Sequence, residues 1–277
     1  MRPKITRHVS RRTVVAAALV LGGFGAGSLT SIGDSAIASK KYHSSEGLGD
    51  VVFLSHVNTE TMPIFPGDPV PVIEDTFTVE NDGFKLQTVT IGDHSGTHWG
   101  APCHFNEGEA CAQDMNPEDF VHPAVVVDIR AQSAADPDYA LTVEDLKKFE
   151  RRNGRIPRDA VVIAWTGWQE KWNDAAAYFN QDADEVMHYP GISAEATSWL
   201  IDKRHLGGLG IDTHGVDPGA DVTYLTNTLL LQDHRIHIEN MTGLEQLPPI
   251  GAWVVVGGVR NEGGSGSPAT VLGLIPD

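Results

Sequence analysis

The stretch Asp93–Phe105, DHSGTHWGAPCHF, concentrates the metal-binding chemistry of this sequence. His94, His98 and His104 fall within eleven residues, and neutral imidazole is the commonest metal ligand in proteins. The interleaved glycines and the proline make a regular helix unfavourable here. We therefore predict a loop wrapped around a metal ion. The alternative is a glycine-rich turn whose histidines are solvated.

The alternating pattern of residues 84–91 predicts a strand that leads directly into the histidine stretch. A loop at the end of a strand is a common place for a functional site. Further strands are expected at residues 51–54, 124–129, 160–165, 209–212, 235–239, 252–257 and 269–274. Residues 61–71 are expected to be an extended loop and residues 263–267 a flexible one.

Two helices are predicted from their start signals. Thr142 and Asp145 resemble a capping box that opens a helix to about Arg152, and Ser193 begins a second helix through Ile201. Strands and helices mix without regular alternation, which indicates an α/β fold with a mixed sheet and helices on one side. No GxGxxG follows a strand, so nucleotide cofactors are not expected.

Residues 1–38 have the pattern of a twin-arginine signal peptide. Arg11 and Arg12 precede an apolar stretch, and residues 36–38 form an AxA cleavage site. The apolar stretch is too short and glycine-rich for a membrane span, although an uncleaved anchor is an alternative. We expect a secreted, periplasmic or cell-envelope protein that leaves the membrane after processing. Residues 39–50 would be a flexible tether and residues 51–277 a single catalytic domain.

The mature chain is strongly acidic. Removing residues 1–38 takes five basic and one acidic side chain from totals of 20 and 37, which leaves 15 and 36. This balance repels phosphate backbones and anionic lipid, so nucleic-acid and membrane-surface functions are disfavoured. A small-molecule substrate is the expected partner. The length suits one α/β domain.

Cys103 and Cys111 are the two cysteines of the chain. Export makes a disulfide chemically permissible. Three interpretations stay open: a disulfide that fastens the loop, a soft metal ligand at Cys103, or a small buried thiol.

Four motifs together resemble one known family. HSGTHWGAPCHF at 94–105 is similar to the HxGTHxDxPxHF signature of the cyclase family, which includes bacterial kynurenine formamidase and isatin hydrolase. LSHVNTETMPIFPGDP at 54–69, DTHGVDPG at 212–219 and IENMTGLEQLP at 238–248 look like other segments of that family. The resemblance implies a swivelling β/β/α domain that assembles as a homodimer or homotetramer.

The resemblance also implies a metal site. Relatives use zinc or manganese to hydrolyse amides, lactams or lactones, and a metal acidifies water and polarises a carbonyl. By resemblance, His94 and His98 would be metal ligands. His104 would be a second-site ligand or catalytic base, and Glu239 a ligand or acid/base group.

Two positions depart from the family pattern. Gly100 stands where the family has a metal-binding Asp, and Asn227 stands twelve residues before Glu239, where relatives often have a histidine. We therefore expect one divalent metal, zinc or manganese. His94 and His98 would hold it with a third group, and an open position would remain for water. The candidates for the third group are His104, Asp212, His214 and Glu239.

Other side chains have simpler interpretations. His234 and His237 are predicted to be surface or hydrogen-bonded positions, and Asp212 and Asp217 can bond local backbone amides. Trp99, Trp165 and Trp168 would line a pocket or belong to the core.

The sequence as a whole predicts an exported metal-dependent hydrolase of a small cyclic or aryl amide or ester, similar to an arylformamidase. The alternative is a metal-poor member of the family that binds a small molecule or catalyses a ring closure without hydrolysis.

Overall fold

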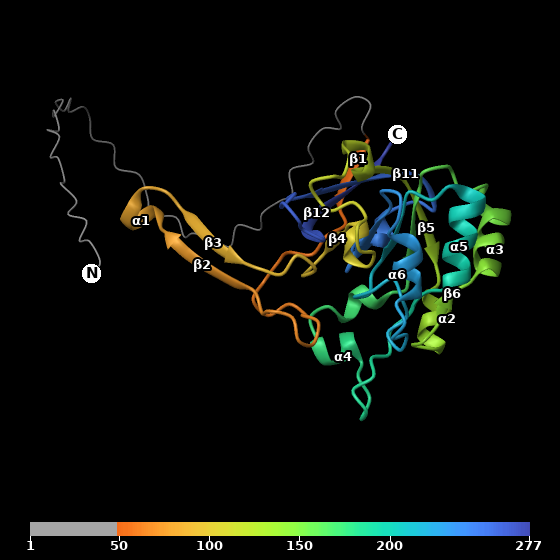
Figure 1. The fold of residues 1–277 in the computed structure, drawn as a ribbon, viewed down its shortest axis with the longest axis horizontal. Coiled ribbons are helices and arrows are strands. Elements are labelled where there is room, and N and C mark those ends of the chain that lie inside the picture. The colour runs from red at the N-terminus through yellow and green to blue at the C-terminus, as the bar shows by residue number, and fades with distance from the viewer. Residues whose placement is uncertain (1–48) are drawn as a thin grey trace, which may run out of the picture. The chain divides into compact units, whose positions relative to one another are not determined.

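The computed structural model describes residues 49–277, which are built on an eight-stranded sheet (Figure 1). Its strands are β1 (Asp50–Phe53), β4 (His98–Gly100), β5 (Val121–Asp128), β7 (Val161–Trp165), β9 (Gly208–Ile211), β10 (Ile236–Glu239), β11 (Ile250–Gly258) and β12 (Gly266–Ile275). They pair in the order β1-β12-β11-β5-β7-β9-β10-β4, and β12 also pairs with β4. The sheet therefore closes into a barrel.

The sheet is mixed, as predicted. β5, β7, β9 and β10 run parallel to one another, whereas β1, β4, β11 and β12 join by antiparallel pairings. The predicted mixed α/β class is thus confirmed, and the closure of the sheet is an additional feature. The more specific expectation of a swivelling β/β/α domain stays a prediction.

Two hydrophobic cores lie on opposite faces of the central strands. Successive side chains of a strand point to opposite faces. Val125 joins a core with Leu146 and Leu200 of the helices, whereas Val126 joins a second core with Trp99. The helices are α2 (Arg130–Ala135), α3 (Val143–Asn153), α4 (Ala175–Phe179), α5 (Ala194–Arg204) and α6 (Leu225–Leu230). Short 3-10 turns occur at Pro102–His104, Pro117–Phe120, Trp168–Lys171 and Leu244–Gln246.

Both predicted helix starts are confirmed. Thr142 caps α3 by accepting from the backbone N–H of Asp145, whose carboxylate in turn accepts from the backbone of Thr142. Ser193 caps α5 by accepting from the backbone N–H of Ala196. These caps satisfy donors that the first helical turn cannot pair internally.

The histidine stretch differs from the predicted loop. Three of its residues form β4, which lies between β10 and β12. Both partner strands come from more than 130 residues further along the sequence. Local pattern therefore could not reveal this strand. Part of the predicted flexible loop 263–267 is likewise ordered, because β12 begins at Gly266.

Cys103 and Cys111 form a disulfide. This settles the three interpretations of the cysteine pair: the disulfide that fastens the loop is present, and the metal-ligand and free-thiol interpretations were wrong. Closing such a short loop stabilises a fold by about 2–3 kcal/mol in chain-entropy terms. The disulfide therefore restrains the segment that follows the histidine stretch.

A hairpin stands apart from the large sheet (Figure 1). It consists of β2 (Val72–Phe77), the short helix α1 (Val79–Asp82) and β3 (Leu86–Thr90), and its two strands form a separate sheet. β3 confirms most of the strand predicted at 84–91, whereas β2 was not predicted. The other small sheet joins β6 (Ala140–Leu141) to β8 (Gly191–Ile192).

The signal peptide predicted at residues 1–38, and nearly all of the tether predicted at 39–50, lie outside the described residues. Within residues 49–277, no helix has the length and apolar character needed to cross a membrane.

Candidate metal centre

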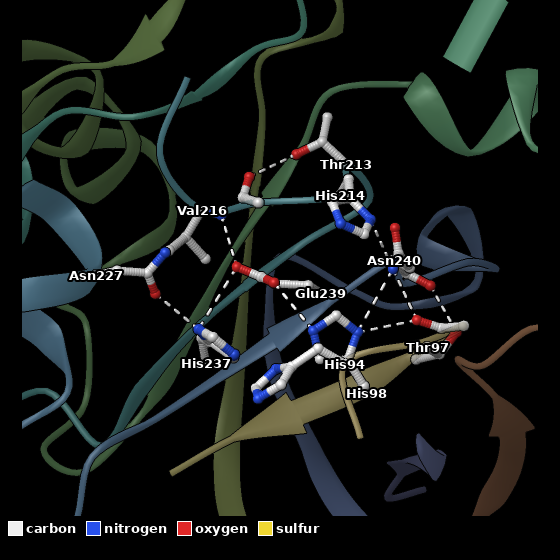
Figure 2. Close-up of polar contacts among 12 residues, drawn as sticks. His94, Thr97, His98, Thr213, His214, Val216, Asn227, His237, Glu239 and Asn240 are labelled. Atoms are coloured by element: carbon white, nitrogen blue, oxygen red, sulfur yellow. Dashed lines mark hydrogen bonds and ion pairs between the residues drawn. The ribbon is translucent and has the colours of Figure 1, made fainter. Parts of the chain in front are cut away.

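Three histidines bring unpartnered ring nitrogens to one place. One ring nitrogen from each of His94, His98 and His237 lies within 4.8 Å of the others (Figure 2). Nδ1 of His94, Nε2 of His98 and Nε2 of His237 are buried and have no hydrogen-bond partner. A buried polar atom without a partner is costly. Three such nitrogens facing one another have the donor chemistry of a metal site.

The opposite ring nitrogen of each histidine is held by an oxygen. His98 Nδ1 donates to the carbonyl of Gly96 (3.0 Å), and His237 Nδ1 donates to Oδ1 of Asn227 (2.7 Å). His94 Nε2 lies 2.9 Å from Oγ of Ser265, which itself donates to a carboxylate oxygen of Asp93. A neutral imidazole carries one N–H, so these contacts leave the inner nitrogens as lone pairs. Outer contacts of this kind orient metal-binding histidines.

Burial lowers the pKa of two histidines of the cluster, His237 and His94. It lowers the pKa of His237 to about 3. Burial also lowers the pKa of His94, and the neighbouring imidazoles lower it further. Both rings are therefore uncharged at pH 7, which is the form that binds metals.

The turn between His94 and His98 depends on Gly96. Its φ of +62° is unfavourable for residues with side chains, and an added Cβ would lie 2.3 Å from Oδ1 of Asn58. The carbonyl of Gly96 also accepts from the side chain of Asn240 (2.7 Å). This contact joins the histidine turn to the residue that follows β10.

Glu239 supplies the carboxylate of the centre. One oxygen lies 3.1 Å from Nε2 of His98, and the other accepts from the backbone N–H of Val216 (2.9 Å; Figure 2). Burial raises the pKa of Glu239, but His237, His98 and His214 more than offset this effect and lower it overall. Glu239 is therefore ionised at pH 7.

A cavity of about 460 Å³ opens onto these side chains. His104 lines it, and its ring stacks on the ring of His94 at a centroid distance of 3.6 Å. The aromatic side chains in the wall are Phe65, Phe105, Tyr189 and Tyr224. The cavity thus combines apolar walls with imidazole and carboxylate groups at one end, as small-molecule sites commonly do.

Comparison with known proteins identifies the family. Residues 52–218 match the family described as Putative cyclase. The chain belongs to this cyclase family. It is 30% identical over 207 residues to isatin hydrolase of Roseibium aggregatum, which covers 71% of this chain and 78% of that protein. It is 26% identical over 188 residues to kynurenine formamidase of Erythrobacter litoralis, with 68% and 76% covered.

The fold comparison agrees with the sequence comparison. The solved structure of isatin hydrolase A from Ralstonia solanacearum superposes with a TM-score of 0.76 at 33% identity. The match covers 82% of this chain and 92% of that one. The resemblance to the cyclase family predicted from the sequence motifs is therefore confirmed.

The structure brings together His94, His98, His104 and Glu239, which the resemblance had singled out. The metal and catalytic roles of these side chains stay predictions.

Two other candidates for the third metal ligand, Asp212 and His214, are not part of the cluster of three histidines. The carboxylate oxygens of Asp212 accept from Thr166 and Gln169, which lie 46 and 43 residues away in the sequence, and not from the local backbone amides that we expected. The ring of His214 stacks on Phe65 at a centroid distance of 4.9 Å.

The prediction for His237 was wrong. We expected a surface or fully hydrogen-bonded position, but His237 is buried in the centre with one unpartnered nitrogen. The pattern RIHIE at 235–239 did contain a signal. Ile236 and Ile238 were predicted to share one face, so His237 and Glu239 must share the other.

Trp99, Trp165 and Trp168 pack in or against the hydrophobic cores and do not line the cavity. Trp99 is fully buried in the core enclosed by the sheet, and Trp165 packs against that core. Trp168 belongs to a third cluster with Tyr178. The aromatic wall of the cavity was not predicted, because its members come from four separate loops.

Proposed function

We propose that this protein is a metal-dependent hydrolase that opens the amide bond of an uncharged aryl lactam or aryl amide. The observation that carries the proposal is the set of three unpartnered imidazole nitrogens at the end of an aromatic cavity. The similarity to isatin hydrolase and kynurenine formamidase supports the same class of reaction.

The residues present fit a divalent ion. When bound, such an ion acidifies a water molecule and polarises a carbonyl group. Hydrolysis adds water across the C–N bond, so the carbonyl carbon gains a hydroxyl group and the nitrogen gains a proton. His104 and Glu239 line the cavity and can carry this proton. The aromatic wall provides apolar surface for a flat ring.

The charge of the cavity lining selects among substrates. The lining includes the carboxylates of Asp68, Asp93, Asp217, Asp221 and Glu239, and none of the described residues that line it is lysine or arginine. An anionic substrate group would meet repulsion from these carboxylates, and no lysine or arginine of the described lining offsets it. We therefore favour a neutral lactam, such as isatin, over substrates that carry a free carboxylate.

This preference can be tested with two ring-substituted isatins of similar size. We expect isatin-5-sulfonamide, which is neutral, to have the higher kcat/KM in zinc-loaded or manganese-loaded enzyme. The expected difference from the 5-sulfonate is about fivefold or more, because like charges at about 4 Å repel by about 1 kcal/mol even in water. Asp68→Asn should reduce the difference in kcat/KM between the two compounds, because it removes one carboxylate from the cavity lining. Equal rates for both compounds would contradict the charge argument, whereas no hydrolysis of any lactam or formanilide would contradict the proposed function.

Export by the twin-arginine route forms part of the proposal. Disulfides persist in oxidising compartments and are rare in the cytosol. The Cys103–Cys111 bond supports passage to such a compartment. Since this route carries folded proteins, metal loading can precede export.

We also propose that a second copy of the chain covers the β2–β3 hairpin. The hairpin exposes Val72, Phe77, Val79, Phe84, Leu86 and Val89. An isolated pair of strands is marginally stable in water, and apolar clusters of this kind mark contact sites. Symmetric dimers are the commonest assemblies, which agrees with the homodimer or homotetramer expected from the family.

Light scattering coupled to size exclusion tests this assembly. The parent chain should elute with a mass of two or four chains, and the Phe84→Asp/Leu86→Asp variant should shift to a monomer, because buried carboxylates oppose association. Val259→Asp is the control, since Val259 is also exposed but lies just after the end of β11, outside the hairpin. A monomeric parent chain would contradict the proposal.

A further inference from the structure

The position of His237, which contributes one of the three nitrogens of the cluster, depends on how the short strands β4 and β10 pair. In the antiparallel pairing of β4 with β10, Gly100 lies directly opposite His237 and His98 lies directly opposite Glu239. Directly opposed residues project their side chains from the same face of a sheet. These positions therefore form a square patch that faces the cavity, with glycine at one corner.

The imidazole of His237 occupies the space that a side chain at position 100 would need. A Cβ added to Gly100 would lie 2.0 Å from Nε2 and 2.6 Å from Cε1 of His237. No real Cβ approaches another heavy atom this closely, so any residue except glycine at position 100 would displace the ring. The missing side chain is thus what admits the imidazole to the cluster.

Asn227 fixes the ring in that space. Its Oδ1 accepts from Nδ1 of His237 (2.7 Å), and its Nδ2 donates to the carboxylate of Asp217 (2.9 Å). The Asp217 contact determines which end of the amide faces the histidine. Both of the other contacts that Asp217 accepts come from backbone N–H groups, of Thr226 and Asn227. The chain Asp217–Asn227–His237 therefore aims Nε2 at the nitrogens of His94 and His98.

We propose that His237 is the third nitrogen ligand of a single divalent ion, and that Gly100 and Asn227 are the residues that place it there. This inference rests on the proposed function and specifies the ligand set of the same site. A site of three neutral imidazoles leaves one position open, which is the arrangement of catalytic zinc centres. Glu239 then provides the only carboxylate on the patch.

Cobalt binding measures the ligand set directly. Metal-depleted full chain would be titrated with Co²⁺ by calorimetry and by visible absorption, which reports the nitrogen donors and the geometry of the ion. We expect one ion per chain. His237→Ala should weaken binding by more than the roughly 10–100-fold that loss of an outer contact causes, and Asn227→Ala should fall within that range.

Gly100→Ala is the sharpest variant, because it keeps every ligand and adds a single methyl group. It should weaken Co²⁺ binding about as much as His237→Ala does. The double variant Gly100→Ala/His237→Ala should be no weaker than His237→Ala alone, since both changes act through the same ring. Gly257→Ala in β11 is the control: an added Cβ there contacts only one carbonyl oxygen, at 3.3 Å. Melting curves of the metal-free variants show whether each one folds.

The outcomes separate this inference from the proposed function. If the parent chain binds Co²⁺ while folded His237→Ala and Gly100→Ala bind it with unchanged affinity and spectrum, His237 is not a ligand. The inference would then fail and the metal-dependent function would stand. If the parent chain binds neither Co²⁺ nor Zn²⁺, both fail.

Discussion

The variant His98→Ala should lose activity by on the order of 10³-fold or more in kcat/KM, because a direct metal ligand matters more than the outer contacts worth roughly 10–100-fold. His98 is 1% exposed, and its Nδ1 is committed to the carbonyl of Gly96. Its Nε2 makes no well-aligned hydrogen bond, although a carboxylate oxygen of Glu239 lies 3.1 Å away. The pairing of β4 with β10 holds His98 directly opposite Glu239.

The control for this variant is His188→Ala. His188 also contacts carboxylates, those of Asp138 and Asp182, but it does not line the cavity. Its removal should leave kcat/KM unchanged. A His98→Ala enzyme that melts like the parent chain when metal-free and hydrolyses a lactam at the parent rate would refute the site.

Glu239→Gln should lower kcat/KM by about 10²–10⁴-fold, the range for loss of a group that transfers a proton. The substitution keeps the shape of the side chain and an oxygen that can accept from Val216. It removes the negative charge beside His98 and His237. Because imidazole ligands bring no negative charge to a metal ion, this carboxylate is the nearest compensation for a divalent ion.

Two measurements distinguish the roles of Glu239. If the carboxylate transfers a proton, Glu239→Gln should alter the pH dependence of kcat/KM and leave Co²⁺ affinity nearly unchanged. If it binds the ion, the affinity should fall. Glu245→Gln is the matched control, because Glu245 accepts only from Gln169 on an exposed part of the chain. A Glu239→Gln enzyme with parent activity and affinity would show that the carboxylate has neither role.

The sequence predicted those parts of the fold that local pattern determines. Apolar β-branched runs such as 124–129 and 160–165 became central strands, and the capping residues Thr142 and Ser193 began helices. β4 could not be predicted, because three residues carry no periodicity. It exists only through pairing with β10 and β12.

Only part of the candidate site was predicted from the sequence, because some of its residues are placed by long-range strand pairing and not by local pattern. His94, His98 and Glu239 belong to motifs that resemble the family, so they were found without a structure. His237 belongs to no such motif, and its place depends on which residue faces it across the sheet. In the sequence, Gly100 was an argument against a metal site, because it replaces the metal-binding Asp of the family. The structure instead places the ring of His237 in the volume that this glycine leaves open.

Zinc-edge anomalous diffraction from crystals of the zinc-loaded protein tests the central claim most directly. We expect one ion per chain, with nitrogens of His94, His98 and His237 at about 2.0–2.1 Å. A crystal without an anomalous peak between these three rings, from protein that contains well under one ion per chain, would contradict the account. It would favour the metal-poor alternative.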